Sequence, residues 1–278
     1  MLNGLSVDVE EWFQVGAFER TIDRADWPAL ESRVAGNTGR VLDLFAEAGV
    51  KATFFTLGWV AERSPALIRR IVAEGHEIAS HGWDHQRVFT FTPEQFRADL
   101  ARARAALEDA GGAKVTGYRA PSFSIDARSP WAHAVLAEEG YAYSSSVAPV
   151  RHDHYGWRES PRYAWKPFAD ASLIELPVTV AEVAGRRMAT GGGFFRLFPA
   201  ALTDFAVRQV AGEGRPAVFY FHPWEVDPDQ PRVRNAPLRS RVRHYSRQGA
   251  MAGKLAGLVR RHEWGRVDAV VAHEAGRT

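Results

Sequence analysis

Two histidines four positions apart raise the question of what chemistry this chain could do. His81 and His85 lie in the segment IASHGWDH, and the apolar residues before them are typical of the end of a short buried strand. On one helical turn, this spacing would direct both imidazoles to the same side. Two neutral imidazoles and a carboxylate would form the ligand set of a catalytic divalent metal ion and leave one position open. The pair alone is weak evidence, because helical sequences produce it by chance, so a carboxylate elsewhere must complete the set.

The N-terminal segment offers carboxylates on one side of a predicted strand. Residues 5–10 read LSVDVE, and the alternation of apolar and polar types places Ser6, Asp8 and Glu10 on a single face. An edge strand with a solvated face would give the same pattern. The segment therefore supplies a candidate ligand, but it does not identify one by itself.

Two more polar side chains follow predicted strands, namely Arg119 in GYRAPSF and His222 in AVFYFHPWE. Arg119 could instead be a surface arginine, and His222 could be a hydrogen-bonded histidine that closes a buried strand. In a (β/α) barrel, however, the residues that carry the chemistry lie at the C-terminal ends of the strands. Because the histidine pair and the N-terminal acids also lie at the ends of predicted strands, their coincidence favours one shared metal site.

Strands and helices alternate along most of the chain. Helix ends are indicated by signals such as the capping box at Thr92-Pro93-Glu94-Gln95 and the C-terminal cap Gly49. Such alternation predicts parallel strands with right-handed crossovers, and seven or eight units favour a closed (β/α) barrel in one α/β domain over an open sheet. The predicted strands cover 5–10, 51–57, 77–79, 117–121, 141–145, 173–179, 217–222 and 267–272, and the predicted helices cover 40–48 and begin at 65, 93 and 130.

Composition limits the class of protein. With 278 residues and 46% hydrophobic content, the chain can bury a large core. It contains no cysteine, so disulfides and thiolate metal sites are excluded, and a metal would need His, Asp or Glu ligands. The net charge of +2 comes without a basic run that would indicate nucleic-acid binding. No signal peptide or membrane-spanning run is visible, and we therefore expect a soluble, cytoplasmic protein.

The motifs SVDVEEW, SHGWDH, RAPSF and FYFHPWE stand in the order and spacing of a known family. The chain resembles the polysaccharide deacetylases with the NodB homology domain, carbohydrate esterase family 4, over nearly its whole length. The segments LSVDVEEWFQV, GGGFFRLFP and FHPWEVDPDQPR are more narrowly similar to deacetylases encoded with exopolysaccharide export and exosortase systems. The resemblance implies a single domain over 1–278 with a distorted barrel of seven or eight (β/α) units, and a C-terminal extension particular to this branch from about residue 223.

The same resemblance implies one divalent metal ion, zinc in many relatives, and removal of N-acetyl groups from N-acetylhexosamines in a poly- or oligosaccharide. It carries over His81 and His85 as metal ligands and Asp8 as the catalytic base. The common family pattern has two adjacent aspartates, whereas Val9 follows Asp8 here. We therefore expect Glu10, on the same strand face as Asp8, to be the third ligand, with Glu11 in reserve.

Hydrolysis of an amide needs an activated water, stabilisation of the oxyanion and a proton for the leaving nitrogen. In the mechanism that the resemblance implies, Asp8 accepts the proton of the water and His222 protonates the amine. Arg119 would pair with Asp8 through its planar guanidinium, which suits a carboxylate better than an ammonium group does. Pro121 would fix the turn that presents Arg119.

Aromatic side chains near strand ends are candidates for stacking on sugar rings, although each could equally be core packing. The residues 226–247 include six arginines and would be a lid or rim for a charged glycan, or a solvated excursion. The candidate substrate-binding residues are Trp12, Phe13, Trp83, Pro121, Phe123, Tyr155 and Trp224.

Two other functions would fit parts of this pattern. A metal-dependent amidase of the allantoinase-like type would keep the same ligands but act on a small amide. A catalytically silent glycan-binding protein would lack a working acid or base, and the joint presence of Asp8, Arg119 and His222 argues against it. The sequence leaves the glycan, the metal and the oligomeric state open.

Overall fold

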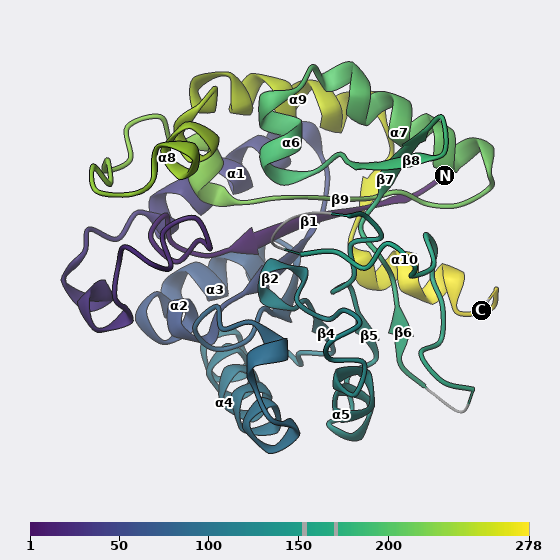
Figure 1. The fold of residues 1–278 in the computed structure, drawn as a ribbon, viewed down its shortest axis with the longest axis horizontal. Helices are drawn as coiled ribbons and strands as arrows, with labels where there is room; N and C mark the ends of the chain where they lie inside the picture. Colours follow the sequence, from purple (N-terminus) through teal and green to yellow (C-terminus); the bar gives the residue numbers. More distant parts are fainter. Residues whose placement is uncertain (152–154, 170–171, 278) are drawn as a thin grey trace.

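The computed structural model describes residues 1–151, 155–169 and 172–277, and eight strands form one curled sheet at its centre (Figure 1). The strands run in the order β10, β1, β2, β3, β4, β5 and β6, and β9 also pairs with β1. All of these pairings are parallel. The strands are β1 Asn3–Val9, β2 Thr53–Thr56, β3 Glu77–Ser80, β4 Gly117–Tyr118, β5 Tyr143–Ser144, β6 Ile174–Glu175, β9 Val218–Phe221 and β10 Trp264–Gly265.

The sheet curls back on its own first strands. After β6, the N–H of Thr179 donates to the carbonyl oxygen of Val218 in β9 at 3.0 Å, and the N–H of Val218 donates to the Thr179 hydroxyl at 2.8 Å. This closure between the last and first parts of the sheet confirms the predicted distorted (β/α) barrel in a single domain.

Helices pack around the outside of the barrel, and an antiparallel hairpin follows β6 (Figure 1). The capping box predicted at Thr92 and Gln95 is present at the start of α4, and Gly49 closes α1 with a φ of 67°. None of the helices in the described part of the chain is both long and apolar enough to cross a membrane. The helices are α1 Val34–Ala48, α2 Gly58–Arg63, α3 Pro65–Ala73, α4 Pro93–Gly111, α5 Ala132–Glu138, α6 Gly192–Leu197, α7 Ala200–Gly212, α8 Leu238–Tyr245, α9 Met251–Arg261 and α10 Val267–Glu274; the hairpin strands are β7 Val180–Val183 and β8 Arg186–Ala189.

Strand β1 shows how the sequence separates core from site. Leu5, Val7 and Val9 belong to the main apolar core, which they share with residues of the surrounding helices. Ser6 and Asp8, which alternate with them, are also buried but contact a guanidinium inside the barrel. One strand therefore places its apolar side chains in the outer core and its polar side chains in the interior.

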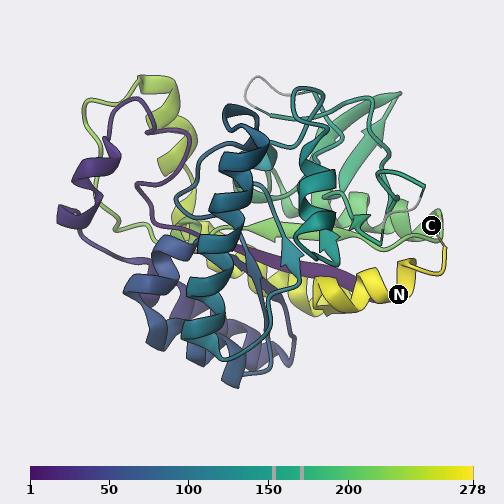
Figure 2. The same cartoon turned by 90° about the horizontal axis from the view of Figure 1, so that it is seen from below.

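The strand predicted for residues 267–272 is wrong, because these residues begin helix α10. Val267, Val270 and Val271 recur at helical spacing and pack into a second apolar cluster with strand residues such as Phe55 and Tyr143. Figure 2 shows α10 beside the N-terminal part of β1. The richness in valine indicated a strand, but burial of one helical face overrode that preference.

The loop after β3 that carries the histidine pair is not a helical turn, contrary to the sequence interpretation. Gly82 and His85 both have positive φ values, 77° and 63°. Two helices support this loop, since the N–H of Gly58 in α2 donates to the Gly82 carbonyl at 2.9 Å and Asp99 of α4 accepts from the N–H of Trp83. The loop is therefore held from outside by α2 and α4.

The close approach of α2 to this loop requires a glycine at position 58. A Cβ there would lie 2.6 Å from the Trp83 ring and 2.9 Å from the Ala103 backbone. We expect Gly58→Ala to lower the free energy of unfolding by about 1–3 kcal/mol through overpacking, as measured by urea denaturation. The matched control is Gly36→Ala in α1, where no atom lies within 4 Å and a small gain in stability is expected. Equal effects at the two positions would contradict the packing argument.

Asp99 should make stability depend on pH. Its partial burial, together with the nearby Asp84 carboxylate, raises the pKa of Asp99 to about 7. A raised pKa means that the folded state binds more protons, so the stabilisation is full below the unfolded-state pKa of about 4 and is lost as pH rises through about 7. The side chain of Asp99→Asn cannot ionise but can still accept from the N–H of Trp83. When the pH is raised from about 5 to about 8, the free energy of unfolding of this variant should therefore fall by less than that of the wild type.

The control for this measurement is Asp109→Asn, which changes an exposed aspartate on the same helix. It should follow the wild-type pH dependence. If Asp99→Asn also follows it, then Asp99 does not titrate in this range.

Candidate active site

The C-terminal ends of four strands surround one cavity of about 430 Å³. Asp8 lies near the end of β1, His81 follows β3, and His222 follows β9, and all three line this cavity. Arg119 follows β4 and lies beneath the lining, in contact with Asp8. The structure thus brings together the side chains that the sequence placed at separate strand ends.

Glu10, His81 and His85 form a compact cluster in which one ligand atom of each lies within 4.8 Å of the others. The Nε2 atom of His85 is 2.7 Å from Oε2 of Glu10, and no other hydrogen-bond partner reaches this buried oxygen among the described residues. The other oxygen of Glu10 accepts from the indole N–H of Trp224 at 3.0 Å. Oε2 of Glu10 and the two imidazoles fit a divalent metal ion, which takes carboxylate oxygen and imidazole nitrogen as ligands.

The protonation states of the cluster also suit metal binding. Burial lowers the pKa of His81 to about 4, so its ring is neutral near pH 7. Its Nδ1 lies 2.8 Å from the carbonyl oxygen of Arg119, which fixes the tautomer with the proton on Nδ1 and leaves Nε2 with a lone pair. Burial raises the pKa of Glu10, but His85 and the other imidazoles outweigh it and lower that pKa, so Glu10 is a carboxylate.

Glu11, the reserve candidate, lies away from the cluster. Its carboxylate accepts from the hydroxyl of Ser32 and from the backbone N–H groups of Arg33 and Val34, at the first residue of α1. The first turn of a helix has N–H groups without partners in the helix, and an acidic side chain satisfies them. The geometry therefore gives Glu11 a structural place at the start of α1 and favours Glu10 for the metal.

Asp8 is held by the guanidinium of Arg119. Nη1 of Arg119 donates to Oδ1 of Asp8 at 2.7 Å, and the ion pair is shielded from solvent. Oδ2 of Asp8 lies 4.0 Å from Nε2 of His222. The aspartate is therefore fixed by one oxygen while the other faces the cavity side of the site.

His222 is oriented by a carboxylate three residues further along. Its Nδ1 lies 2.7 Å from Oε1 of Glu225, so Nε2 is directed to the side of Asp8 and Glu10. Burial lowers the pKa of His222, but the hydrogen bond to Glu225 and the charges of the three carboxylates outweigh it and raise the pKa to about 9. The ring is thus protonated and can donate from Nε2.

The aromatic residues predicted to contact sugar divide into two groups. Phe123, Tyr155 and Trp224 line the cavity, but Trp224 is stacked between His222 and His244, at centroid distances of 5.1 and 4.3 Å. Both faces of this indole are therefore covered, which argues against a sugar on its ring. The other four candidates, Trp12, Phe13, Trp83 and Pro121, do not line the cavity.

Packing explains why these four residues lie elsewhere. Trp12 and Phe13 form an apolar cluster with Trp27, and the Trp12 indole N–H donates to the carbonyl of Glu31. The ring of Trp83 lies under the guanidinium of Arg102 at 3.5 Å. Pro121 is buried at the start of the turn that follows Arg119. These four side chains therefore lie outside the cavity in this structure, contrary to the expectation from their places near strand ends.

Several cavity residues were not predicted as site residues. Helix α6 contributes Phe194, Arg196 and Leu197, and Phe198 follows it directly; the GGGFFRLFP segment that forms this part was noticed only as a family resemblance. Two adjacent glycines allow its approach, since a Cβ at Gly191 or Gly192 would lie within 3.0 Å of Tyr220. The glycine run was therefore the signal for a close contact with β9, and with the site.

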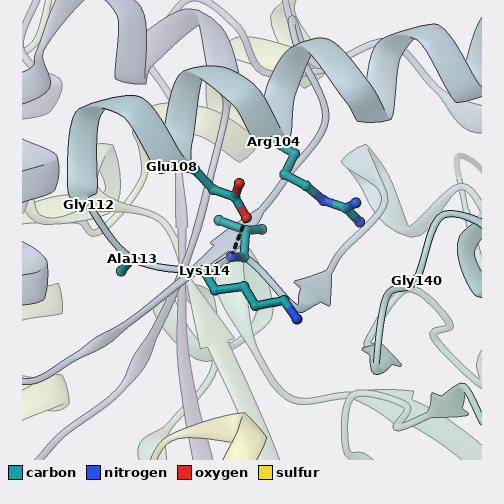
Figure 3. Close-up of a pocket in the computed structure, with 7 residues that line it drawn as sticks. Arg104, Glu108, Gly112, Ala113, Lys114 and Gly140 are labelled. Atoms are coloured by element: carbon teal, nitrogen blue, oxygen red, sulfur yellow. Dashed lines mark hydrogen bonds between the residues drawn. The ribbon is translucent and has the colours of Figure 1, made fainter.

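A second cavity, of about 520 Å³, lies at the other end of the barrel (Figure 3). Arg104, Glu108 and Lys114 line it at the C-terminal end of α4, where Glu108 accepts from the N–H of Val115. This position is at the N-terminal end of β4, away from the strand ends that carry the histidines. It lacks the cluster described above and is not the candidate active site.

Two family models match consecutive parts of the chain. Residues 21–143 match the family Polysaccharide deacetylase, and residues 145–272 match a domain of unknown function (DUF3473). Both regions contribute strands to the same sheet. The site also draws on both, with His81, His85 and Arg119 in the first region and His222 in the second.

Known proteins are similar to parts or all of the chain. A chitooligosaccharide deacetylase from Sinorhizobium fredii is 34% identical over 144 residues, which are 51% of this chain and 60% of that protein. A crystal structure assigned as a polysaccharide deacetylase from Mycobacterium smegmatis has a TM-score of 0.64 at 22% identity, over 99% of this chain and 91% of the other. The crystal structure of an allantoinase has a TM-score of 0.62 at 14% identity, over 98% and 89%.

At these identities the solved structures show a common fold. The chain matches only part of the length of the curated relatives: 19% of a peptidoglycan-N-acetylglucosamine deacetylase from Listeria monocytogenes, and 60% of the Sinorhizobium fredii protein. The match to the family Polysaccharide deacetylase covers residues 21–143, and the sheet continues beyond this match through β6, β9 and β10. Residues 21–143 are therefore similar in sequence to the polysaccharide deacetylases, and nearly the whole chain shares the fold of the solved structures.

Proposed function

We propose that this protein is a metal-dependent deacetylase that hydrolyses the N-acetyl group of N-acetylhexosamine residues in a poly- or oligosaccharide. The observation that carries the proposal is the convergence on one cavity of a metal-ligand cluster, a carboxylate held by arginine and a protonated histidine. These groups correspond to the three needs of amide hydrolysis. The match to the deacetylase family and the chitooligosaccharide deacetylase relative support this substrate class.

Glu10, His81 and His85 would hold the metal ion. When bound, a divalent ion such as zinc supplies Lewis acidity, both for the acetyl carbonyl and for the attacking water. The residues themselves set the charge of the site, since the two imidazoles are neutral ligands and Glu10 contributes one negative charge. We assign the third ligand to Glu10 because Glu11 is committed to the start of α1.

Asp8 would act as the general base. Its Oδ1 accepts from Arg119, which fixes the carboxylate, and its Oδ2 can accept the proton of the attacking water. Since the hydroxyl of Ser6 is also bound by Nη1 of Arg119, the same guanidinium nitrogen ties two residues of β1. The base is thereby positioned before substrate arrives.

His222 would act as the general acid. When the C–N bond of the amide breaks, the electron pair goes to nitrogen, and the proton on Nε2 of His222 transfers to it to give the free amine and acetate. Glu225 holds Nδ1 of the ring and stabilises the protonated form. An amine is a poor leaving group without this proton.

We further propose a role in exopolysaccharide biosynthesis, which rests on the three segments LSVDVEEWFQV, GGGFFRLFP and FHPWEVDPDQPR. Each of these segments contributes to the cavity or to its immediate support. The genes beside this one would test the proposal, because it requires neighbours for polysaccharide polymerisation or export.

The direct test of the activity is acetate release from chitooligosaccharides by the purified protein after loading with zinc. We expect release by the wild type, none by Asp8→Asn, and none from allantoin. Release of product from allantoin instead would identify the protein as a small-amide hydrolase. Glycan binding with no acetate release under any metal would identify a silent binding protein.

Metal content should separate the three N-terminal acids. Glu10→Ala removes the one negative ligand, so we expect its metal affinity to fall by at least roughly 10 to 100-fold, the loss typical of even an indirect partner of a metal site. Replacement of His81 or His85 by alanine should likewise remove the ion. Elemental analysis of the purified variants, with their melting temperatures, measures both effects.

Two variants serve as controls. Asp8→Asn should keep about one ion per chain while it loses activity, because a base does not need to bind the metal. Glu11→Ala should keep the ion but lower the free energy of unfolding by about 1 kcal/mol, through loss of the contacts at the start of α1. Loss of the ion in Glu11→Ala with retention in Glu10→Ala would show that the ligand assignment is wrong.

Removal of His222 should affect amide and ester substrates differently. We expect His222→Ala to lower kcat by roughly 10²-fold or more on an acetamide substrate, the range of a lost general acid. An ester of the same acyl group should suffer less, because its alkoxide leaving group needs protonation less than an amine does. Equal losses on both substrates would show that His222 serves another purpose, such as holding the structure of the site.

A further inference from the structure

The segment 226–247, which follows β9, concentrates positive charge on a chain that is otherwise nearly neutral. It holds six arginines and two aspartates, whereas the net charge of all 278 residues is +2. Asp227 is buried and ion-paired with Arg33 of the N-terminal region. The exposed part of the segment is therefore strongly basic.

Helix α8 within this segment has two different sides. Arg239, Ser240, Arg243 and His244 line the cavity, and His244 is buried. This side, which holds the helix against the site, cannot bind another partner without opening the cavity.

The outward side of α8 is apolar at its centre. Leu238 and Val242 are 72% and 57% exposed, and their spacing places them together on one face of the helix. They are the most exposed large apolar side chains among the described residues. Arg241 of the helix is exposed next to Val242 in the chain, and Arg234, four residues before the helix, is also exposed.

We propose that the outward side of α8, defined by Leu238, Arg241 and Val242, docks on an anionic lipid membrane together with the exposed Arg234 of the turn that precedes the helix. Exposed apolar side chains within a basic helix are the pattern of segments that lie in the membrane interface, where the apolar groups insert between lipids and the arginines contact anionic headgroups. An anionic glycan would attract the arginines but would give no reason for the two aliphatic side chains to be exposed. The lipid surface accounts for both.

Figure 1 shows α8 at one end of the molecule, and Figure 2 shows the same segment beside the N-terminal excursion that follows β1. Phe18 of that excursion contacts His244 and Tyr245, so the docking helix is anchored to the rest of the protein. Because the opposite side of α8 lines the cavity, docking would place the cavity beside the lipid headgroups. Resting on the proposed function, this would direct the deacetylase to acetylated glycans held at a membrane surface.

Co-sedimentation with vesicles tests the docking surface. We expect the wild type to sediment with vesicles of phosphatidylcholine and phosphatidylglycerol, less with phosphatidylcholine alone, and less again in high salt. Leu238→Ser with Val242→Ser, and separately Arg234→Glu with Arg241→Glu, should each lower the partition coefficient on the order of tenfold or more.

The matched control is Phe205→Ser with Arg208→Glu, which removes an exposed phenylalanine and an exposed arginine from α7. This control should sediment as the wild type does. Acetate release from a soluble chitooligosaccharide should be unchanged in all of these variants, which shows that they are folded. Asp8→Asn should bind vesicles normally, so a failure of the proposed activity and a failure of docking are distinguishable.

Three outcomes would overturn the proposal. One is vesicle binding that neither pair of α8 substitutions changes. The second is a dimer in sedimentation velocity that Leu238→Ser with Val242→Ser dissociates, which would make this face a contact between two copies. The third is retention on an anionic polysaccharide that depends on the arginines, with no binding to vesicles.

Discussion

The guanidinium of Arg119 is the interaction on which the interior of the barrel depends. It has no exposed surface, and a buried charge costs several kcal/mol unless it is paired and fully hydrogen-bonded. Its donors reach Ser6 and Asp8 of β1 and both the carbonyl and the hydroxyl of Ser145 beyond β5, and its plane lies over the ring of Phe55. Removal of Asp8 or Ser145 would leave N–H donors of Arg119 without acceptors. The same guanidinium therefore holds β1 to the segment after β5 and fixes the position of Asp8, the proposed base.

Charge compensation extends from this pair to the rest of the site. Glu10 lies against His85 and receives a hydrogen bond from Trp224, and Glu225 lies between His222 and the buried guanidinium of Arg196. Each carboxylate therefore has a cationic or hydrogen-bonding partner from a different element. A site built in this way keeps its charges in place without substrate, which is the arrangement that electrostatic catalysis requires.

Much of this arrangement follows from the sequence, for identifiable reasons. A strand end followed by a polar residue is a local signal, and parallel topology brings such ends together, so the positions of Asp8, His81 and His222 could be predicted without knowing their distances. The choice between Glu10 and Glu11 followed from strand alternation, and the structure gives Glu11 a partner in α1 that alternation could not reveal. The helical turn expected for His81 and His85 was wrong, because Gly82 and His85 have positive φ values and the loop is held by contacts of Gly82 with α2 and of Trp83 with α4, which local spacing could not reveal.

The aromatic residues show where local reasoning fails. Trp12, Trp83 and Trp224 lie close to site residues in sequence, but the direction of each ring is set by partners distant in sequence, namely Glu31, Arg102 and His244. Sequence proximity to a strand end therefore predicts the position of a backbone better than the contact of a large side chain. The contribution of α6 was missed for the same reason, since the residues of α6 and β9 that contact each other are separated by more than twenty positions in the sequence.

Arg196 of α6 explains why the C-terminal region is part of the site rather than an appendage. Its guanidinium donates to the carbonyl oxygens of Arg243 and Ser246 at 2.8 and 2.7 Å, at the C-terminal end of α8, and lies 3.4 Å from the carboxylate of Glu225. The last carbonyls of a helix lack partners within it and carry partial negative charge, so a cation there satisfies both needs. The group that holds α8 against the cavity is thus also the counter-ion of the carboxylate that holds His222. Any movement of α8 away from the barrel would withdraw those carbonyls from Arg196 and disturb Glu225, so the orientation of His222 depends on the seating of a helix more than fifteen residues further along the chain.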